Sequence, residues 1–157
     1  MAHWKEVVKR LEALKANIPR IVGIEMLNHA NENLRSESFE GSKWPARKPG
    51  APRDSGRRLL LDTGDGQRSV RIVREDQTQV DLTANDYMEA HNEGARISGS
   101  FAVSAHSRTR KGRTEQVRSH TRQVNTTLPE RAFIKASKKL IERVNRAVFK
   151  RIFDILK

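Results

Sequence analysis

Apolar residues recur at helical spacing near both ends of the chain. The N-terminal stripe includes Val7, Leu11 and Leu14, and it resumes beyond Pro19. Because proline is tolerated in the first turn of a helix and not in its interior, we expect two helices, 3–16 and 19–35. The stripe near the C-terminus predicts one helix over 132–156, with the basic face typical of an amphipathic helix that packs on a sheet.

The middle of the chain changes from helical spacing to alternation. Polar and apolar residues alternate over 69–74 and 79–83, which predicts two antiparallel strands joined by a polar turn. Residues 87–93 predict a short helix, closed by Gly94 as a left-handed cap. Before these elements, the closely spaced prolines of residues 36–58 predict a long loop. Its aromatic residues, Phe39 and Trp44, are expected to anchor the loop to the core or to a neighbouring subunit.

Residues 95–128 predict a long basic β-hairpin arm. Phe101, Val103 and Ala105 alternate with small polar residues, and the sequence Lys111-Gly112 falls near the expected tip. An isolated two-stranded ribbon is only marginally stable in water. We therefore expect the arm to become ordered against another subunit or inside an assembly.

These elements predict one α+β domain over residues 1–157, since a chain of 157 residues is long enough to bury a core of its own. The expected fold is a small antiparallel sheet packed by a long C-terminal helix and the N-terminal helices, with the basic arm projecting from it. Its successive segments are 1–35 (N-terminal helices), 36–58 (loop), 59–94 (sheet and short helix), 95–128 (arm) and 129–157 (C-terminal helix).

The net charge of +12 is concentrated in the C-terminal part of the chain. Residues 96–128 carry seven basic side chains and one acidic, and residues 129–157 carry nine and three. A one-sided basic field attracts nucleic acid or an acidic protein surface. No aromatic residues interleave the cations of the arm, so a contact with nucleic acid would be to phosphates, insensitive to sequence and weakened steeply by salt.

Signatures of catalysis and of cofactor binding are missing from the sequence. The chain has no cysteine, which excludes disulfides and thiolate metal sites and suits a reducing cytoplasm. Its five histidines show no metal-ligand spacing, and neither a Gly-Lys-Ser/Thr phosphate loop nor a Gly-x-Ser-x-Gly elbow occurs. We expect no enzyme, no metal and no cofactor. No apolar run is long enough for a membrane helix, so no membrane association is expected.

Three short blocks in a fixed order carry most of the remaining information, and each joins a glycine or proline to an apolar anchor. They are Leu59-Leu60-Leu61-Asp62-Thr63-Gly64, Tyr87-Met88-Glu89-Ala90-His91-Asn92-Glu93-Gly94 and Leu128-Pro129-Glu130-Arg131-Ala132-Phe133. With Phe39 and Trp44-Pro45 upstream, the order resembles the phage virion morphogenesis family, the tail completion proteins of the Mu and P2 type. Two positions depart from the family pattern: Gly66 stands where an apolar residue is usual, and Met88 where a small one is usual.

The resemblance implies a structural virion protein, without catalytic activity, that completes or caps the phage tail and helps to join it to the DNA-filled head. Proteins of this kind commonly form rings, and the family likeness suggests a hexamer. The implied partners are copies of the chain itself and other tail and neck proteins, with a non-specific DNA contact left open. The protein would be made in the cytoplasm of a bacterial host and would reside in the virion. The alternative is a free-standing, sequence-nonspecific nucleic-acid-binding protein.

Nine residues are candidates for an oligomer interface or a surface that faces a central channel: Phe39, Trp44, Arg108, Arg110, Lys111, Arg113, Arg118, Arg122 and Arg131. Among them, Arg131 could pair with a carboxylate such as Asp62, either within its own subunit or across a subunit boundary. His91 is expected to hydrogen-bond its turn or the strand that follows, because a neutral imidazole can donate and accept at once.

Overall fold

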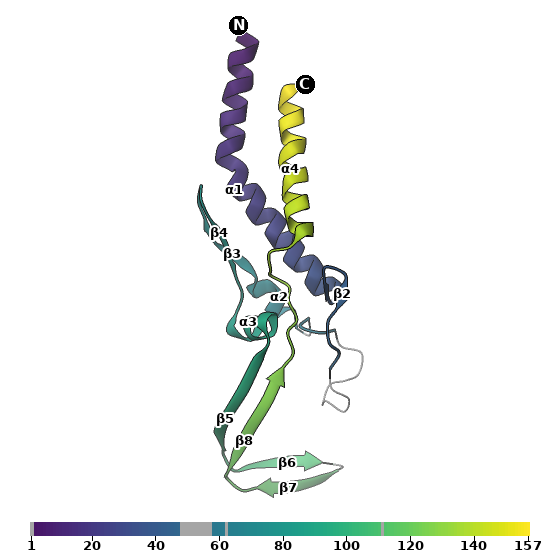
Figure 1. Cartoon of the computed structure of the whole chain (residues 1–157). Coiled ribbons are helices and arrows are strands. Elements are labelled where there is room, and N and C mark those ends of the chain that lie inside the picture. The colour runs from purple at the N-terminus through teal and green to yellow at the C-terminus, as the bar shows by residue number, and fades with distance from the viewer. Residues whose placement is uncertain (1, 48–57, 62, 111) are drawn as a thin grey trace.

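The computed structural model describes residues 2–47, 58–61, 63–110 and 112–157. The molecule is elongated: two long helices lie side by side at one end, small β elements and short helices occupy the middle, and a two-stranded arm extends from the other end (Figure 1). The α+β class is confirmed. The expected single sheet is wrong, because the described strands form four separate two-stranded antiparallel sheets.

The N-terminal part is one continuous helix, α1 (Ala2–Ser36), and the expected break before Pro19 is wrong. The helix bends part-way along its length (Figure 1), and an interior proline is a usual cause of such a bend. Continuing a helix through proline costs about 3 kcal/mol. The C-terminal helix packs against α1, and this packing opposes the cost of the interior proline. Leu14 and Ile24, on either side of Pro19, line a groove between the two helices.

The C-terminal helix, α4 (Lys138–Leu156), begins six residues later than expected and runs antiparallel to α1. Ser137 is its N-cap, and the Ser137 hydroxyl accepts a hydrogen bond from the Leu140 amide at 3.1 Å. Residues 129–137 are not helical, because the segment is held extended by contacts described below. Helix α4 packs on α1, whereas the sequence indicated that it would pack on a sheet.

The remaining predictions for residues 36–94 are mostly confirmed. The described part of the expected loop contains a minimal hairpin, β1 (Ser38–Phe39) and β2 (Ser42–Lys43), while Pro49 and Pro52 lie outside the described residues. A short helix, α2 (Asp65–Ser69), follows Gly64 and was not among the predicted elements. The two predicted strands are β3 (Arg71–Glu75) and β4 (Val80–Thr83), and they pair antiparallel.

Two glycines explain how these elements meet. Gly23 of α1 lies against the β3–β4 hairpin so closely that a Cβ there would lie 2.8 Å from Ile72 Cδ1. The predicted short helix is α3 (Asp86–Glu93), and Gly94 follows it with a positive φ. The torsions of Gly94, φ 75° and ψ 145°, are not those of a left-handed cap; they belong to a region that is nearly exclusive to glycine.

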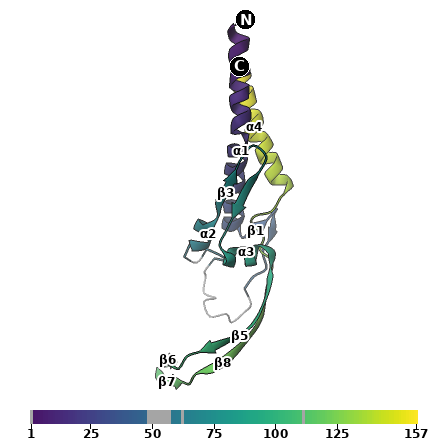
Figure 2. The ribbon, with the colours of Figure 1, turned by 90° about the vertical axis from the view of Figure 1, so that its left-hand side faces the viewer.

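The arm is the hairpin that the sequence predicts. Strand β5 (Ala95–Val103) pairs with β8 (His120–Leu128), and β6 (His106–Arg110) pairs with β7 (Arg113–Val117). Both pairs share one register. Val103 lies opposite His120, and three residues further along each strand His106 lies opposite Val117. The arm is therefore one hairpin that bends where pairing lapses (Figure 1), and Figure 2 shows it curving away from the axis of the helices.

Candidate assembly interface

The motif blocks, far apart in the sequence, meet in one buried cluster that we call the motif junction. Its apolar centre combines residues of α1 with the motif residues, and Phe133 is fully buried, with 0% of its surface exposed. The members of the cluster are Ala30, Leu34, Trp44, Leu60, Val70, Met88 and Phe133. The turn-and-anchor blocks thus build the core of the subunit itself.

Arg131 is buried at the edge of the motif junction, with 5% of its surface exposed. Its Nε and Nη2 atoms donate to the Pro45 carbonyl at 3.2 and 3.0 Å, and its Nη1 atom donates to His91 Nδ1 at 3.2 Å. Burial lowers the pKa of the guanidinium. The side chain therefore ties together three of the motif segments within one subunit. Asp62, the carboxylate partner suggested by the sequence, lies outside the described residues.

The extended segment after Pro129 is held by side chains that stand in for a strand partner. Asn92 Oδ1 accepts from the amides of Phe133 and Ile134, both at 2.9 Å, and Asn92 Nδ2 donates to the Ile134 carbonyl at 3.1 Å. The Trp44 indole donates to the Ala132 carbonyl at 3.0 Å, and Asn33 donates to the Phe133 carbonyl at 3.2 Å. Because these bonds satisfy the backbone in an extended form, the helix cannot begin before Ser137.

Two buried histidines border the core. An arginine can only donate, so His91 Nδ1 is the acceptor and the proton of its ring lies on Nε2. The ring also packs edge-on against Tyr87, with centroids 4.7 Å apart. His29 Nε2 lies 3.2 Å from the Ser137 hydroxyl, and His29 Nδ1 has no hydrogen-bond partner among the described residues. Burial lowers the pKa of both imidazoles, so both are neutral at pH 7.

Gly66 and Met88, the two positions at which the sequence departs from the family that it resembles, lie against each other. A Cβ placed on Gly66 would lie 2.5 Å from Met88 Sδ and 3.1 Å from Met88 Cγ. The methionine thus fills the space that a side chain at position 66 would occupy, and Met88 is fully buried. A large residue at 88 and none at 66 is a size exchange that keeps the core filled.

The other aromatic candidate, Phe39, is half-buried, and its ring lies edge-on to His29 with centroids 6.1 Å apart. Trp44 is buried in the motif junction. Trp44 is therefore an anchor to the subunit's own core, whereas Phe39 keeps part of its surface exposed. Trp44 and Arg131 come together at the junction, whereas the basic candidates of the arm lie far from it (Figure 1).

The basic candidates of the arm lie on its outer hairpin and the loop beside it, except for Arg122, which lies on β8. Arg108 forms an ion pair with Glu115 across the β6–β7 hairpin, with Nη2 3.1 Å from Oε2. Arg113, Arg118 and Arg122 are exposed. The side chain of Arg110 and all of Lys111 lie outside the described residues.

The pairing register gives the root of the arm two different faces. Side chains of directly opposed residues share one face of a ribbon. One face therefore carries the apolar Ala95, Ile97, Phe101, Val103, Val124 and Leu128, together with His120, Arg122 and Thr126. The other face is mainly polar and carries Arg96, Ser98, Ser100, Thr121, Gln123, Asn125 and Thr127. Phe101 is 53% exposed and Ile97 39%. The arm thus presents an uncovered apolar face, which the sequence pattern alone only hinted at.

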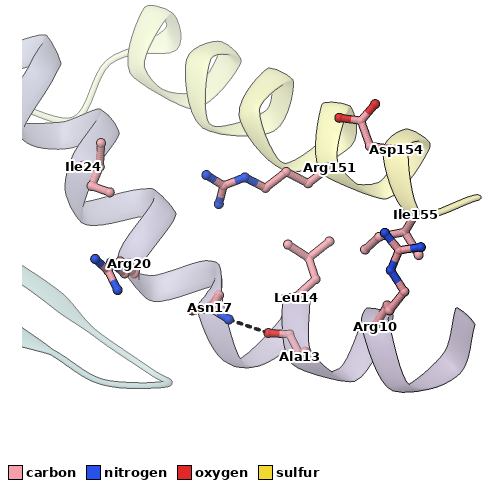
Figure 3. Close-up of a pocket in the computed structure, with 9 residues that line it drawn as sticks. All are labelled: Arg10, Ala13, Leu14, Asn17, Arg20, Ile24, Arg151, Asp154 and Ile155. Atoms are coloured by element: carbon pink, nitrogen blue, oxygen red, sulfur yellow. Dashed lines mark hydrogen bonds between the residues drawn. The ribbon is translucent and has the colours of Figure 1, made fainter. Parts of the chain in front are cut away.

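A groove of about 670 Å³ lies between α1 and α4 (Figure 3). Arg10, Arg20 and Arg151 contribute to its lining with Leu14 and Ile155, and its one carboxylate is that of Asp154. A nucleophile paired with a base is missing from this set, so the groove does not suit acyl transfer or hydrolysis. Within the described residues there is no group of histidines and carboxylates that could hold a metal, and no helix suited to crossing a membrane.

Comparison of the chain with protein-family models, with curated proteins and with solved structures finds no match. Its function must therefore be argued from the motif junction and the arm.

Proposed function

We propose that this protein is a structural component of a phage virion, a tail completion protein that forms a ring where the tail joins the head. It would be made in the cytoplasm of a bacterial host, act without catalysis or a cofactor, and contact other tail and neck proteins. The hexamer that the family likeness suggests is the oligomer we favour.

One observation carries the proposal: the motif blocks on which the resemblance rests build a single junction from which a long arm projects. Hydrogen bonds join three separate motifs at this junction. Arg131 donates to His91 and to the Pro45 carbonyl, and the Trp44 indole donates to the Ala132 carbonyl. The paired change at Gly66 and Met88 fits the same core in spite of both departures. An ordered core that carries an uncovered arm suits a subunit that interlocks with others better than it suits an enzyme.

The test is the assembly state of the purified protein. Light scattering after size exclusion, over a wide range of protein concentrations, should reveal a closed oligomer, and negative-stain electron microscopy should show annuli. Tail-tube and neck proteins are added in a second series, which tests for a ring that forms only on a partner. A strict monomer in both series would contradict the proposal.

The second candidate is a sequence-nonspecific nucleic-acid-binding protein. It is favoured by the exposed Arg113, Arg118 and Arg122, which could contact phosphates. A gel shift with random duplex DNA separates the candidates. Nanomolar binding by a monomer at physiological salt would support this second function, whereas weak binding that modest salt abolishes favours the virion protein.

A further inference from the structure

The apolar residues on one face of the β5–β8 ribbon are exposed, and burying them against a partner would be favourable. A two-stranded ribbon gains little stability alone, and its exposed Phe101 and Ile97 add an unfavourable contact with water. Figures 1 and 2 show that the rest of the subunit lies beyond the root of the arm and leaves most of the ribbon standing free. Because the described part of the subunit leaves this face open, we look for its occupant in another molecule.

Charge on the arm narrows the choice of occupant. Arg113, Arg118 and Arg122 form no ion pair among the described residues. Arg122 lies directly opposite Phe101 and so shares its face, whereas the same register puts Arg113, opposite Arg110, on the other face. A partner surface must therefore offer both carboxylates and apolar contact. The phosphate backbone of DNA supplies negative charge but no cover for Phe101 and Ile97, so a protein surface is the better match.

The chain itself carries such a surface on α3. Residues 75–93 contain six acidic side chains and no lysine or arginine. On α3, Asp86, Glu89 and Glu93 follow helical spacing along one exposed stripe, and none of them forms an ion pair within the part of the chain that the structure describes. Tyr87, the residue after Asp86, is 59% exposed and offers an aromatic surface on the adjoining side of the helix. We call these four residues the α3 stripe.

The arm of a subunit does not reach its own α3 stripe. Helix α3 lies at the root of the arm, since only Gly94 separates it from β5. Arg122 is opposite Phe101, six residues from the root, which at about 3.3 Å per residue is roughly 20 Å away. Arg118 and Arg113 are more distant still. The complementary charges can meet only between two copies.

We infer that the arm of one subunit docks on the α3 stripe of a second copy, with its apolar face against Tyr87 and with Arg118 and Arg122 against Asp86, Glu89 and Glu93. The inference rests on the proposed ring function and names the contact that would build the ring. The two surfaces differ, so the contact is head-to-tail, which is the kind of interface that closes into rings.

Charge exchange between the two surfaces tests the inference. The arm variant carries Arg118→Glu and Arg122→Glu, and the stripe variant carries Asp86→Lys, Glu89→Lys and Glu93→Lys. Either variant alone places like charges opposite one another. The protein concentration at which half of the subunits are assembled should therefore rise by ~100-fold or more. An equimolar mixture should regain assembly, with the two variants alternating around rings of even number.

The matched control reverses two exposed cations of α1, Lys5→Glu and Lys9→Glu, and should assemble as the wild type does. Circular dichroism and urea unfolding establish that each variant is folded. A second, independent readout uses the absence of cysteine from the chain. A mixture of Phe101→Cys and Tyr87→Cys subunits should form disulfide-linked heterodimers on mild oxidation, in excess over either homodimer.

The outcomes separate the inference from the function on which it rests. Rings formed equally well by the wild type and both charge variants would overturn the docking contact and leave the ring function standing. A wild type that stays monomeric, with and without tail components, would overturn both. An arm variant that still assembles but loses its affinity for duplex DNA would assign the arm to nucleic acid and overturn the docking contact.

Discussion

The motif junction and the arm divide the molecule into two regions with opposite physical character. In the junction, side chains from three motif blocks are buried together, and polar groups such as those of Asn92 and Arg131 find partners within the subunit. In the arm, nearly every side chain is exposed, and hydrogen bonds run mainly between the paired strands. The first region is packed within one subunit, whereas the second leaves apolar side chains such as Phe101 exposed.

This difference predicts that the residues that stabilise the subunit and the residues that bind a partner lie in different parts of the chain. Burial of apolar surface stabilises a fold in proportion to the area removed from water, so the junction must supply much of the free energy of unfolding. The arm contributes little to that free energy and is free to carry the residues that recognise a partner. Mutations in the two regions should therefore have different effects.

The largest effect is expected from Phe133→Ala in the junction. Removing a fully buried phenylalanine leaves a cavity, and the free energy of unfolding should fall by about 3–5 kcal/mol. The control is Phe101→Ala in the arm, which should change that free energy by less than about 0.5 kcal/mol. Urea unfolding monitored by circular dichroism measures both. Equal losses from the two variants would break the proposed division.

The contact between Gly66 and Met88 can be tested with a double-mutant cycle. Met88→Ala should cost about 2–5 kcal/mol because it opens a cavity, and Gly66→Ala about 1–3 kcal/mol because its new Cβ crowds Met88. In the double variant the alanine at 66 meets no methionine, so the total loss should be smaller than the sum by about 0.5–3 kcal/mol. Additive losses would show that the two departures from the family pattern are unrelated.

The pH dependence of stability should arise in the junction and its border. Burial lowers the pKa of His29 and His91 below the ordinary 6.5, and the positive charges of Arg143 and Arg131 add to this. Lys139 acts on His29 in the same direction, while Glu32 and Glu40 oppose it. The unfolded chain therefore binds protons first, so stability is full above about pH 6.5 and falls as the pH drops, by at most about 1.4 kcal/mol per pH unit for each histidine.

Urea unfolding between pH 8 and pH 5 (roughly the range in which histidines titrate) measures this slope. His29→Gln and His91→Gln should each reduce it. His106→Gln and His120→Gln, at exposed positions of the arm, are the matched controls and should leave the slope unchanged. The carboxyl of Glu32, whose pKa is lowered by its hydrogen bond to Arg143, loses its contribution only in a more acidic window. If the pH dependence of the free energy of unfolding is unchanged in both His29→Gln and His91→Gln, its assignment to these two histidines is wrong.

Local patterns in the sequence predicted local structure well. The β3–β4 pair, the short helix α3 and the arm with its tip near Gly112 are confirmed, since alternation and turn residues specify elements that are close in sequence. Helix boundaries were predicted less well. The continuity of α1 through Pro19 depends on packing with α4, and the late start of α4 depends on Asn92 and Trp44 holding a distant segment extended. No pattern within those helices contains that information.

The candidate residues show the same limit. Trp44 and Arg131 were singled out because tryptophan and a motif arginine are distinctive in sequence, yet burial in their own subunit could be learned only from the fold. The α3 stripe was missed, since Asp86, Glu89 and Glu93 resembled ordinary solvated residues of a turn-rich region. The signal that could have identified them was the run from 75 to 93, without a basic residue, just ahead of the basic arm.

The smallest effect on stability is expected from removing the outer half of the arm. The pair Val103 and His120 ends the β5–β8 ribbon, so residues 104–119 can be replaced by Asn-Gly, a two-residue turn suited to a hairpin. Because the deleted β6–β7 segment packs mainly on itself, the free energy of unfolding should change by less than about 0.5 kcal/mol. A loss comparable with that of Phe133→Ala would mean that the outer arm is part of the folding unit. With stability unchanged, the same variant keeps Phe101 and Arg122, so any loss of assembly reports on a contact made by the deleted segment and not on a loss of folding.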